Sequence, residues 1–493
     1  MTEAVIPGTS ALELAEAAGT TVNLSLVSHT NAGKTTLTRT MLGRDVGEVR
    51  DAAHVTEIAT GYVLVQEGGD TLMLWDTPGF GDTTRLLTRL RNAGNPIGWL
   101  LTQVWDRWKE RPLWSSQQAV KNARDNADVL LYLVNASEDP AAAGYVAQEM
   151  EVLSWIGKPV LLLLNQMGPP RADTGGEREK WLAHLDVVDV VKGALPLDAF
   201  ARCWVQEGAL LREVEPLLPA DKQPAMGRLS ARWHDLNRAR FDQSMAVLAR
   251  QLTATLQDRE SVRDGTWRDR TLNAFKSGKG EDREVRAAMG ALSERLAERT
   301  RESTSELIRL HGLEGEATRK VLERLGRDYS YSEPTPEGFS AMLGGLASGA
   351  VGGLAADLAA GGLTLGGGMI VGAVLGALGA GGLAKGINMA KGEDGSAVRW
   401  SPEFFQGFVG AALLRYLAVA HFGRGRGAWE EGEHPDFWHG VVEEAVAAHE
   451  GEVAALYKAG RGEGGAEVES ELAALLERIG LDVLGRLYPG AGM

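Results

Sequence analysis

The stretch VNLSLVSHTNAGKTT, residues 22–36, decides the fold of the first part of this chain. Apolar and polar residues alternate at its start, as in a β-strand, and its end opens a helical pattern. A strand that runs through a short loop into a helix presents backbone N–H groups to a phosphate group. The stretch fits the pattern Gly-x4-Gly-Lys-Ser/Thr, except that Ser28 stands in place of the first glycine. It therefore predicts a phosphate-binding loop.

The positions of this loop have distinct predicted roles. The Lys34 ammonium reaches the β- and γ-phosphates, and the Thr35 hydroxyl binds Mg²⁺. Ser28 lacks the freedom of glycine at positive φ, so we expect a slightly reshaped loop. The predicted nucleotide-binding residues of the loop are Asn31, Ala32, Gly33, Lys34, Thr35 and Thr36.

A second motif stands where a nucleotide site requires it. The apolar run 72–75 predicts a buried strand, and Asp76-Thr77-Pro78-Gly79 follows directly. A carboxylate at that strand end can hold Mg²⁺ through water, and the Gly79 N–H can contact a γ-phosphate. Thr56, in a polar loop between the two motifs, is the candidate for a second Mg²⁺ hydroxyl. The predicted metal ligands are Thr35, Thr56 and Asp76, and the predicted catalytic residues are Lys34, Thr56 and Gly79.

Further apolar runs alternate with helical patterns through the first part of the chain. They are residues 62–65, 129–134, 160–164 and 195–197. The first of them is separated from the 72–75 run by a Gly68-Gly69-Asp70 turn, so we expect an antiparallel pair there. Strand–helix alternation over about 180 residues predicts a doubly wound α/β domain. The alternative for its loop is a degenerate form that no longer binds nucleotide.

The segment between Gly79 and Asp128 is too long for a simple crossover between strands. Apolar residues at helical spacing, from Ile97 to Trp108, predict an inserted amphipathic helix within about 84–115 that ends at Pro112. Its apolar side either packs on a neighbouring domain or contacts a membrane surface.

The rest of the 493-residue chain is rich in Arg, Glu, Leu and Ala at helical spacing and predicts a mostly α-helical region. The expected parts of the whole chain are an N-terminal segment (1–20), the P-loop domain (21–205), a helical region (206–335), a Gly/Ala-rich hydrophobic helical hairpin (336–392) and a C-terminal helical region (393–493).

The two motifs resemble those of the Era-like branch of bacterial small GTPases, the group of the TrmE, Era and septin-type proteins. The match covers about residues 20–200 and rests on residues 31–35, Thr56 and residues 76–79. The resemblance implies GTP and GDP as ligands, Mg²⁺ as cofactor and hydrolysis of the β–γ phosphate bond. The whole architecture is similar to an Era-like GTPase fused to a long helical C-terminal domain of unknown function.

The family reads its base with an Asn-Lys-x-Asp motif, expected after the 160–164 run. Asn165-Gln166-Met167-Gly168 stands there, so the asparagine is kept and the lysine and aspartate are absent. Because that aspartate hydrogen-bonds guanine in the family, the choice between guanine and adenine nucleotides stays open. Asp198 stands at the family's fifth motif and either replaces the carboxylate or caps the following helix.

Phe80 stands where Ras-type enzymes place a glutamine that orients the attacking water. Phenylalanine cannot orient water, so we expect slow turnover, assisted by a partner, a homodimer face or K⁺. In K⁺-dependent relatives an asparagine at the position of Asn31 binds the ion; the alternative is that the Asn31 amide only stabilises the loop. His29 and His54 are expected to be polar loop residues and not bases.

Charge and cysteine content narrow the classes of partner. The 51 Lys and Arg residues stand against 66 Asp and Glu residues, and a net charge of −15 argues against a nucleic-acid partner. The single cysteine, Cys203, forms no internal disulfide, and the first residues lack the pattern of a secretory signal. We therefore expect a cytoplasmic location.

Residues 338–392 form a glycine-rich hydrophobic segment. Residues 338–356 and 358–384 carry no charge, and each run is long enough to span about one bilayer. Gly345, Gly349 and Gly353 form a glycine zipper of the kind that lets membrane helices approach closely. Only ten residues of 358–384 are Leu, Ile, Val or Met, so its hydrophobicity is marginal. Three alternatives remain: a stable membrane hairpin entered from the inner face of the cell membrane, a conditional insertion element stored in a soluble fold, and a tight soluble helical hairpin.

Together these features predict a nucleotide-dependent molecular switch. GTP binding and slow Mg²⁺-dependent hydrolysis would move Thr56 and residues 79–127, coupled to the helical domain that carries the glycine-rich segment. The rival hypothesis is a membrane-associated scaffold or pore-like protein that binds nucleotide structurally with little turnover. Phe80 and the altered motif at residues 165–168 favour this rival.

Overall fold

The chain divides into two compact units in the computed structural model. The first comprises Met1–Arg238, His421–Gly432 and Tyr488–Met493, and the second comprises Ala239–Ala420 and Glu433–Leu487. The structure describes residues 19–30, 32–43, 58–103, 110–165, 174–186, 188–196, 204–262, 283–313, 387–392, 395–421, 437–461 and 465–489.

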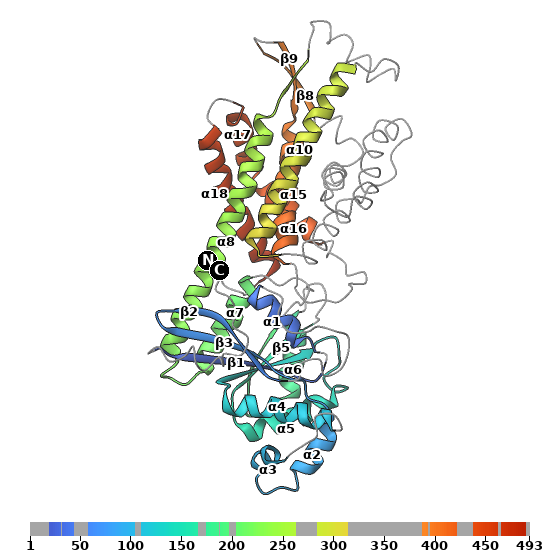
Figure 1. The fold of residues 1–493 in the computed structure, drawn as a ribbon. Coiled ribbons are helices and arrows are strands. Elements are labelled where there is room, and N and C mark those ends of the chain that lie inside the picture. Colours follow the sequence, from blue (N-terminus) through green and yellow to red (C-terminus); the bar gives the residue numbers. More distant parts are fainter. Residues whose placement is uncertain are drawn as a thin grey trace. The chain divides into compact units, whose positions relative to one another are not determined.

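A six-stranded sheet forms the centre of the first unit (Figure 1). Its strand order is β2-β3-β1-β4-β5-β6, and all neighbours are parallel except β2 and β3. This mixed sheet confirms the predicted α/β fold class and the antiparallel pair beside Gly68-Gly69-Asp70. The strands are β1 (Thr21–Val27), β2 (Thr60–Glu67), β3 (Asp70–Asp76), β4 (Val129–Asn135), β5 (Val160–Asn165) and β6 (Val191–Pro196).

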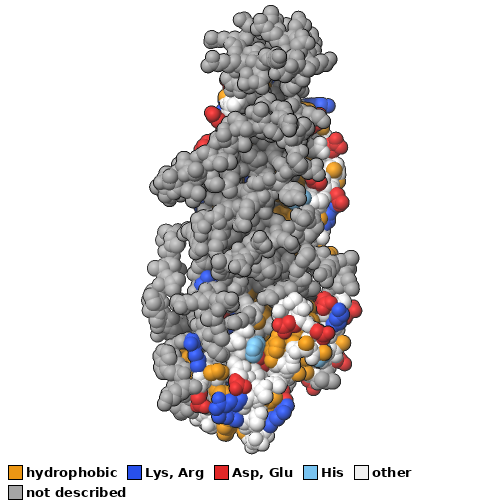
Figure 2. All heavy atoms as spheres, turned by 90° about the vertical axis from the view of Figure 1, so that its right-hand side faces the viewer, with side chains coloured by type: hydrophobic (Ala, Val, Ile, Leu, Met, Phe, Trp, Pro, Cys, Tyr) orange, Lys and Arg blue, Asp and Glu red, His pale blue; other side chains and the backbone are white. Residues whose placement is uncertain are grey.

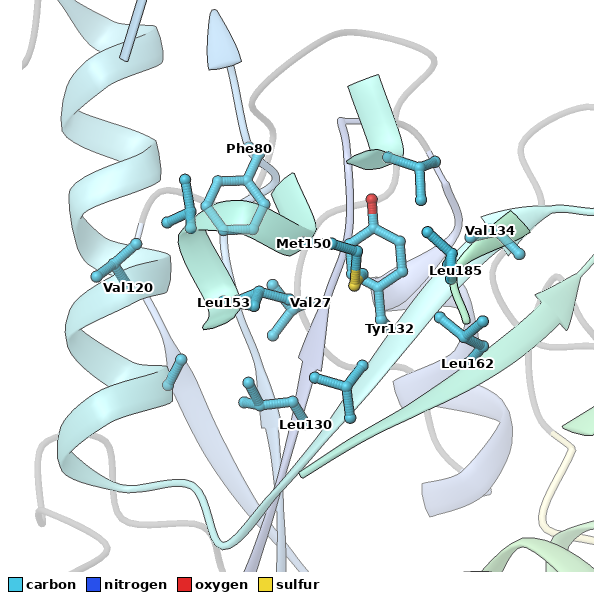
Figure 3. Packing of buried hydrophobic residues seen from close by; sticks show 14 of the residues in the cluster. Val27, Phe80, Val120, Leu130, Tyr132, Val134, Met150, Leu153, Leu162 and Leu185 are labelled. Carbon is cyan, nitrogen blue, oxygen red and sulfur yellow. The ribbon is translucent and has the colours of Figure 1, made fainter. Parts of the chain in front are cut away.

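Apolar residues of the strands alternate between two cores, one on each face of the sheet. On β4, Leu130, Tyr132 and Val134 lie in the core drawn in Figure 3, whereas Leu131 and Leu133 lie in the other core. Because both faces of the strand are buried, β4 is an unbroken apolar run and not an alternating one.

Three helices occupy the segment for which the sequence predicts one inserted helix. They are α2 (Thr83–Leu90), α3 (Pro96–Thr102) and α4 (Arg111–Asp125). Pro112 lies in the first turn of α4, so the prediction that it ends a helix is wrong. Proline is favoured in a first turn because the N–H groups there have no intrahelical acceptor. Residues 104–109 of the predicted helix lie outside the described ranges.

The other helical elements of the first unit join or follow the strands. They are α1 (Lys34–Leu42), α5 (Gly144–Ile156), α6 (Thr174–His184), α7 (Trp204–Val214), the 3-10 helix η2 (Glu215–Leu217) and the beginning of α8 (Gln223–Gln257), within which the division between the units falls.

The second unit is mostly helical, as predicted, but it also contains a small antiparallel sheet. The sheet has the order β7-β9-β8, with β7 (Glu260–Val262), β8 (Ile387–Gly392) and β9 (Gly395–Trp400). The helices are the rest of α8, α10 (Arg283–Leu310), α15 (Pro402–Ala420), α16 (Phe437–Ala448), α17 (Glu450–Ala459) and α18 (Gly465–Leu487).

The small sheet corrects the predicted end of the helical hairpin at 336–392. Its last residues, Ile387–Gly392, form β8 because they pair along their whole length with β9. Residues 336–386, including the glycine zipper, lie outside the described ranges.

One described helix, α15, is long and apolar enough to cross a membrane. Its most apolar window has a mean hydropathy of 1.2, and 67% of that window is buried inside the structure. The core helix of a soluble protein has the same properties, so α15 does not decide among the alternatives for the glycine-rich segment.

Candidate nucleotide-binding site

Gly33 shapes the end of the loop between β1 and α1. It adopts a φ of 94°, a left-handed conformation that favours glycine. A Cβ at this position would also lie 3.1 Å from the side-chain nitrogen of Asn165. The next residue, Lys34, begins α1, whose first N–H groups have no intrahelical acceptor. These groups are suited to binding a phosphate oxygen.

The Lys34 ammonium is buried at the start of the loop. Its Nζ donates to the Ser28 hydroxyl at 2.9 Å, to the His29 carbonyl at 3.2 Å and to the Ser28 carbonyl at 3.5 Å. The serine that replaces the first glycine of the motif therefore adds an acceptor for the lysine. Burial lowers the pKa of Lys34 to about 8, and the charges of Asp76 and Glu149 only partly oppose this shift.

Asp76 and Thr35 meet beside the loop. β1 and β3 are parallel neighbours with Leu26 opposite Asp76, so the carboxylate at the end of β3 lies next to the loop. Thr35 Oγ1 donates to Asp76 Oδ2 at 2.7 Å. A hydroxyl and a carboxylate are oxygen ligands of the kind that Mg²⁺ prefers. Two of the three predicted metal ligands are thus in contact, and the third, Thr56, lies outside the described ranges.

Residues 76–80 lie tightly against the phosphate-binding loop. The Phe80 N–H donates to the Ser28 carbonyl at 2.9 Å, and the Thr30 N–H donates to the Phe80 carbonyl at 3.3 Å. At Gly79 the approach is so close that a Cβ would lie 2.7 Å from Thr30 Cα. This contact places the Gly79 backbone at the loop, as the predicted γ-phosphate contact requires.

The Phe80 side chain belongs to the hydrophobic core and not to the surface of the loop. Its ring is fully buried and lies in the core on one face of the sheet, near Val120 of α4 (Figure 3). The ring therefore stabilises the core, and slow turnover stays a prediction.

Asn165, the retained residue of the base motif, is buried at the end of β5. Its Nδ2 donates to the Ala32 carbonyl at 3.1 Å, so the side chain supports the phosphate-binding loop. Its Oδ1 is also buried, without a hydrogen-bond partner among the described residues. Asn31, residues 166–168 and Asp198 lie outside the described ranges, so their predicted roles remain predictions.

Glu149, on α5, was not predicted as a site residue, yet its fully buried carboxylate joins three parts of the first unit. It accepts hydrogen bonds from Tyr132 OH at 2.6 Å and from Thr83 Oγ1 at 3.1 Å, and it lies 2.8 Å from His29 Nδ1. An ionised carboxylate only accepts hydrogen bonds, so a hydrogen bond at this 2.8 Å contact requires an N–H at His29 Nδ1. His29 is thus a polar loop residue, as expected, and its ring also lies against that of Tyr145.

Tyr132 remains a hydrogen-bond donor to Glu149 over a wide pH range. Burial first, and then the charge of Glu149, raise the pKa of Tyr132 well above its ordinary value. The signal that could have identified Glu149 is its spacing. It falls between Val146 and Met150 on the buried face of α5, where an acidic residue needs hydrogen-bond partners.

The doubly wound sheet, the loop after β1 and the Asp-Thr-Pro-Gly turn against it define a P-loop GTPase fold. Residues 23–166 match the family described as 50S ribosome-binding GTPase. Residues 192–470, more than half of the chain, match the family described as Domain of unknown function (DUF3482), and the chain belongs to that family.

Solved structures similar to this chain include two of Era. Era from Aquifex aeolicus bound to GDP and AlF₄⁻ is 19% identical, with a TM-score of 0.28 over 41% of this chain and 57% of that chain. Era in complex with MgGDPNP and a segment of 16S ribosomal RNA is 19% identical, with a TM-score of 0.29 over 41% of this chain and 58% of that chain. NFeoB from S. thermophilus, bound to mGMPPNP, is 14% identical, with a TM-score of 0.23 over 46% of this chain and 70% of that chain. The chain thus spans less than two thirds of the length of either Era chain, and no curated protein matches it.

Proposed function

We propose that the first unit binds GTP with Mg²⁺, hydrolyses it slowly and acts as a nucleotide-dependent switch. The observation that carries the proposal is the 2.7 Å hydrogen bond between Thr35 Oγ1 and Asp76 Oδ2 beside the buried ammonium of Lys34. A hydroxyl, a carboxylate and a cation at the start of a helix are the groups that a magnesium–triphosphate complex requires.

The donor set fits Mg²⁺ because both Thr35 and Asp76 present hard oxygen atoms. In the proposal these two residues, with Thr56, hold the ion, which neutralises charge on the β- and γ-phosphates when bound. Lys34 binds the same phosphates, and the N–H groups of residues 31–36 bind the phosphate oxygens. The Gly79 N–H contacts the γ-phosphate.

The switch resides in the turn at residues 76–80. In the described structure this turn is hydrogen-bonded to the loop through Ser28 and Thr30. A γ-phosphate that binds the Gly79 N–H would shift the turn next to Phe80, together with α2, which begins at Thr83. Coupling of this movement to the helical second unit is part of the proposal.

Guanine selectivity is the finer part of the proposal. Asn165 supports the loop and has a buried carbonyl oxygen without a partner among the described residues, which is consistent with a place beside the base. Asp198 is the proposed carboxylate for the guanine edge, in place of the aspartate missing from residues 165–168. ATP binding is the alternative outcome.

A calorimetric titration of the full chain with GTP, GDP and ATP in the presence of Mg²⁺ tests the proposal. Lys34→Ala should abolish measurable triphosphate binding, because the β- and γ-phosphates lose their cation. Lys121→Ala, which removes an exposed lysine of α4, is the matched control and should bind as the wild type does. Equal affinity of Lys34→Ala and the wild type for GTP would contradict the assignment of the site.

The second candidate function is a membrane-associated scaffold that binds nucleotide structurally. The burial of Phe80 favours it, because this residue cannot position water. Turnover measured in K⁺ and in Na⁺ separates the candidates: K⁺-stimulated hydrolysis supports the switch and a role for Asn31. Binding without turnover in either salt supports the scaffold. A cytoplasmic location, membrane contact through residues 338–392 and a homodimer are further proposals that fractionation and sedimentation can test.

A further inference from the structure

Three arginines of the second unit lie near one end of its small sheet. Arg259 directly precedes β7, Arg399 lies in β9 and Arg461 follows α17; we call them the arginine cluster. The antiparallel register pairs Glu260 of β7 with Val398 of β9. Arg259 and Arg399 are the next residues along these two segments, on the same side of the pair. Side chains at opposite positions of an antiparallel pair lie on the same face.

Tyr457 brings the third arginine to the same place. Its hydroxyl donates to the carbonyl of Trp400, the residue after Arg399, at 2.7 Å. The guanidinium carbon of Arg461 lies 5.6 Å from the centre of the Tyr457 ring, a cation–π distance. Burial, and then the charges of Arg461 and Arg259, lower the pKa of Arg399. The three cations are therefore within electrostatic range of one another.

The carboxylates on either side of Arg259 are already bound to another arginine. Asp258 pairs with Arg295 at 3.0 Å, and Glu260 pairs with the same guanidinium at 2.9 Å. Within the described ranges, no member of the arginine cluster forms an ion pair. Among the described residues, no paired carboxylate therefore offsets the positive charge of the cluster, although the whole chain has a net charge of −15.

Arg399 also carries an unsatisfied donor. Its Nε is buried and has no hydrogen-bond partner in the part of the chain that the structure describes. A buried charged N–H without an acceptor costs free energy, so such a group in a folded protein calls for a partner. Glu403, exposed at the start of α15, is near enough for its negative charge to act on Tyr457. In the described part of the chain it forms no ion pair with any of the three arginines.

We infer that the arginine cluster binds a phosphate group, carried either by a free phosphate compound or by a phospholipid headgroup. Guanidinium groups present planar forks of N–H donors that match phosphate oxygens, and the resulting hydrogen bonds are charge-assisted. A bound phosphate would accept the Arg399 Nε–H and offset the repulsion among three cations. β8 belongs to the same sheet and is the end of the glycine-rich segment (residues 338–392), so the lipid source is tested separately from the free phosphate compound.

The test uses the full chain carrying Lys34→Ala, so that phosphate binding at the first unit does not contribute. One arm measures sedimentation with phosphatidylcholine vesicles that contain or lack phosphatidylglycerol. The other arm measures calorimetric binding of inorganic phosphate and pyrophosphate. Arg399→Gln and Arg461→Gln are compared with Arg309→Gln, which removes the same charge from an exposed residue of α10 that pairs with Glu306.

The parent chain should bind phosphate groups in at least one arm, and either cluster variant should weaken that binding about tenfold while Arg309→Gln leaves it unchanged. Loss in the vesicle arm identifies the headgroup, and loss in the calorimetric arm identifies a free phosphate compound. Arg461 is exposed, so its variant carries the test if circular dichroism shows that Arg399→Gln is unfolded. No binding by the parent, or equal effects of Arg461→Gln and Arg309→Gln, would overturn the inference. Neither result bears on GTP binding by the first unit.

Discussion

Lys34 lies in a buried environment that disfavours the charged form of its side chain. Burial lowers its pKa from 10.5 to about 8, and the nearby Asp76 and Glu149 recover only part of the cost. A buried ammonium in this state is stabilised by any further negative charge that reaches it. The residue is thus prepared for a phosphate group, and the cost of burying it is present whenever the site is unoccupied.

The depressed pKa of Lys34 makes stability depend on pH. Between about 8 and 10.5 the unfolded chain holds this proton and the folded chain does not, so stability rises with pH through that window. Below it the full cost, roughly 3 kcal/mol, is present. Urea unfolding should therefore show Lys34→Met to be more stable than the wild type below the window, with the difference disappearing above it. A difference that does not change with pH, as expected for Lys121→Met, would contradict the shift.

Glu149→Gln tests the buried hydrogen-bond network. The amide keeps the shape of the side chain, but an NH₂ group replaces one oxygen. Either Tyr132, which bonds to Oε2, or Thr83 and His29, which contact Oε1, then lose their acceptor. We expect a loss of about 2 kcal/mol in the free energy of unfolding. Glu151→Gln on the same helix breaks only an ion pair with Arg91 and should cost less than about 1 kcal/mol. Equal losses in the two variants would show that the network contributes little.

For single residues, the sequence predicts those roles that depend on neighbours in the sequence. Lys34, Thr35 and Asp76 belong to short motifs, and the structure brings them together as the motifs require. Glu149 could not be predicted as a partner of His29, because the two are 120 positions apart and no local pattern links them. The hydrogen bond that the Ser28 hydroxyl accepts from Lys34 also depends on tertiary geometry.

The turn at residues 76–80 is the element on which the proposed switch depends. It is held by two backbone hydrogen bonds to the phosphate-binding loop and by the buried ring of Phe80. Both hydrogen bonds are made by the backbone of Phe80, and the ring of the same residue lies in the core, so Phe80 anchors the end of the turn. Movement is therefore expected at Gly79 more than at Phe80.

Gly79→Ala tests the close approach of the turn to the loop. The new Cβ would lie 2.7 Å from Thr30 Cα. Thr30 Cα is a backbone atom and the backbone fixes the position of a Cβ, so neither atom can rotate away. We expect a loss of about 1–3 kcal/mol in the free energy of unfolding, together with weaker triphosphate binding. Gly94→Ala has no atom within 4 Å of its Cβ and should leave both quantities unchanged. Wild-type behaviour of Gly79→Ala would contradict the described contact.

Elements buried on two faces are the most predictable ones in this chain. β4 and β5 are unbroken apolar runs, and their positions follow from composition alone. β7 is three residues long and β8 contains Asn388 and Lys391, so neither stands out in the sequence. Both exist because they pair with β9, which is distant in sequence from β7.

For the whole molecule, the sequence predicts an α/β unit followed by a mostly helical unit, and the structure has both. The α/β unit is the more predictable because its motifs and strand runs are local. The helical unit contains no comparable motif, and its arginine cluster assembles from three separate segments. On the face drawn in Figure 2, the described basic side chains are interspersed with acidic ones, so the cluster cannot be inferred from total charge.

We propose above all that Thr35 and Asp76 form the magnesium site of a triphosphate-binding protein. The affinity of the full chain for GTP, measured once with Mg²⁺ and once with EDTA, tests this most directly. Mg²⁺ should tighten binding to the wild type by at least about tenfold, and Asp76→Asn should remove this gain while retaining the weak binding measured in EDTA. Lys121→Ala should keep the full gain. An equal gain from Mg²⁺ in the wild type and in Asp76→Asn would contradict the account.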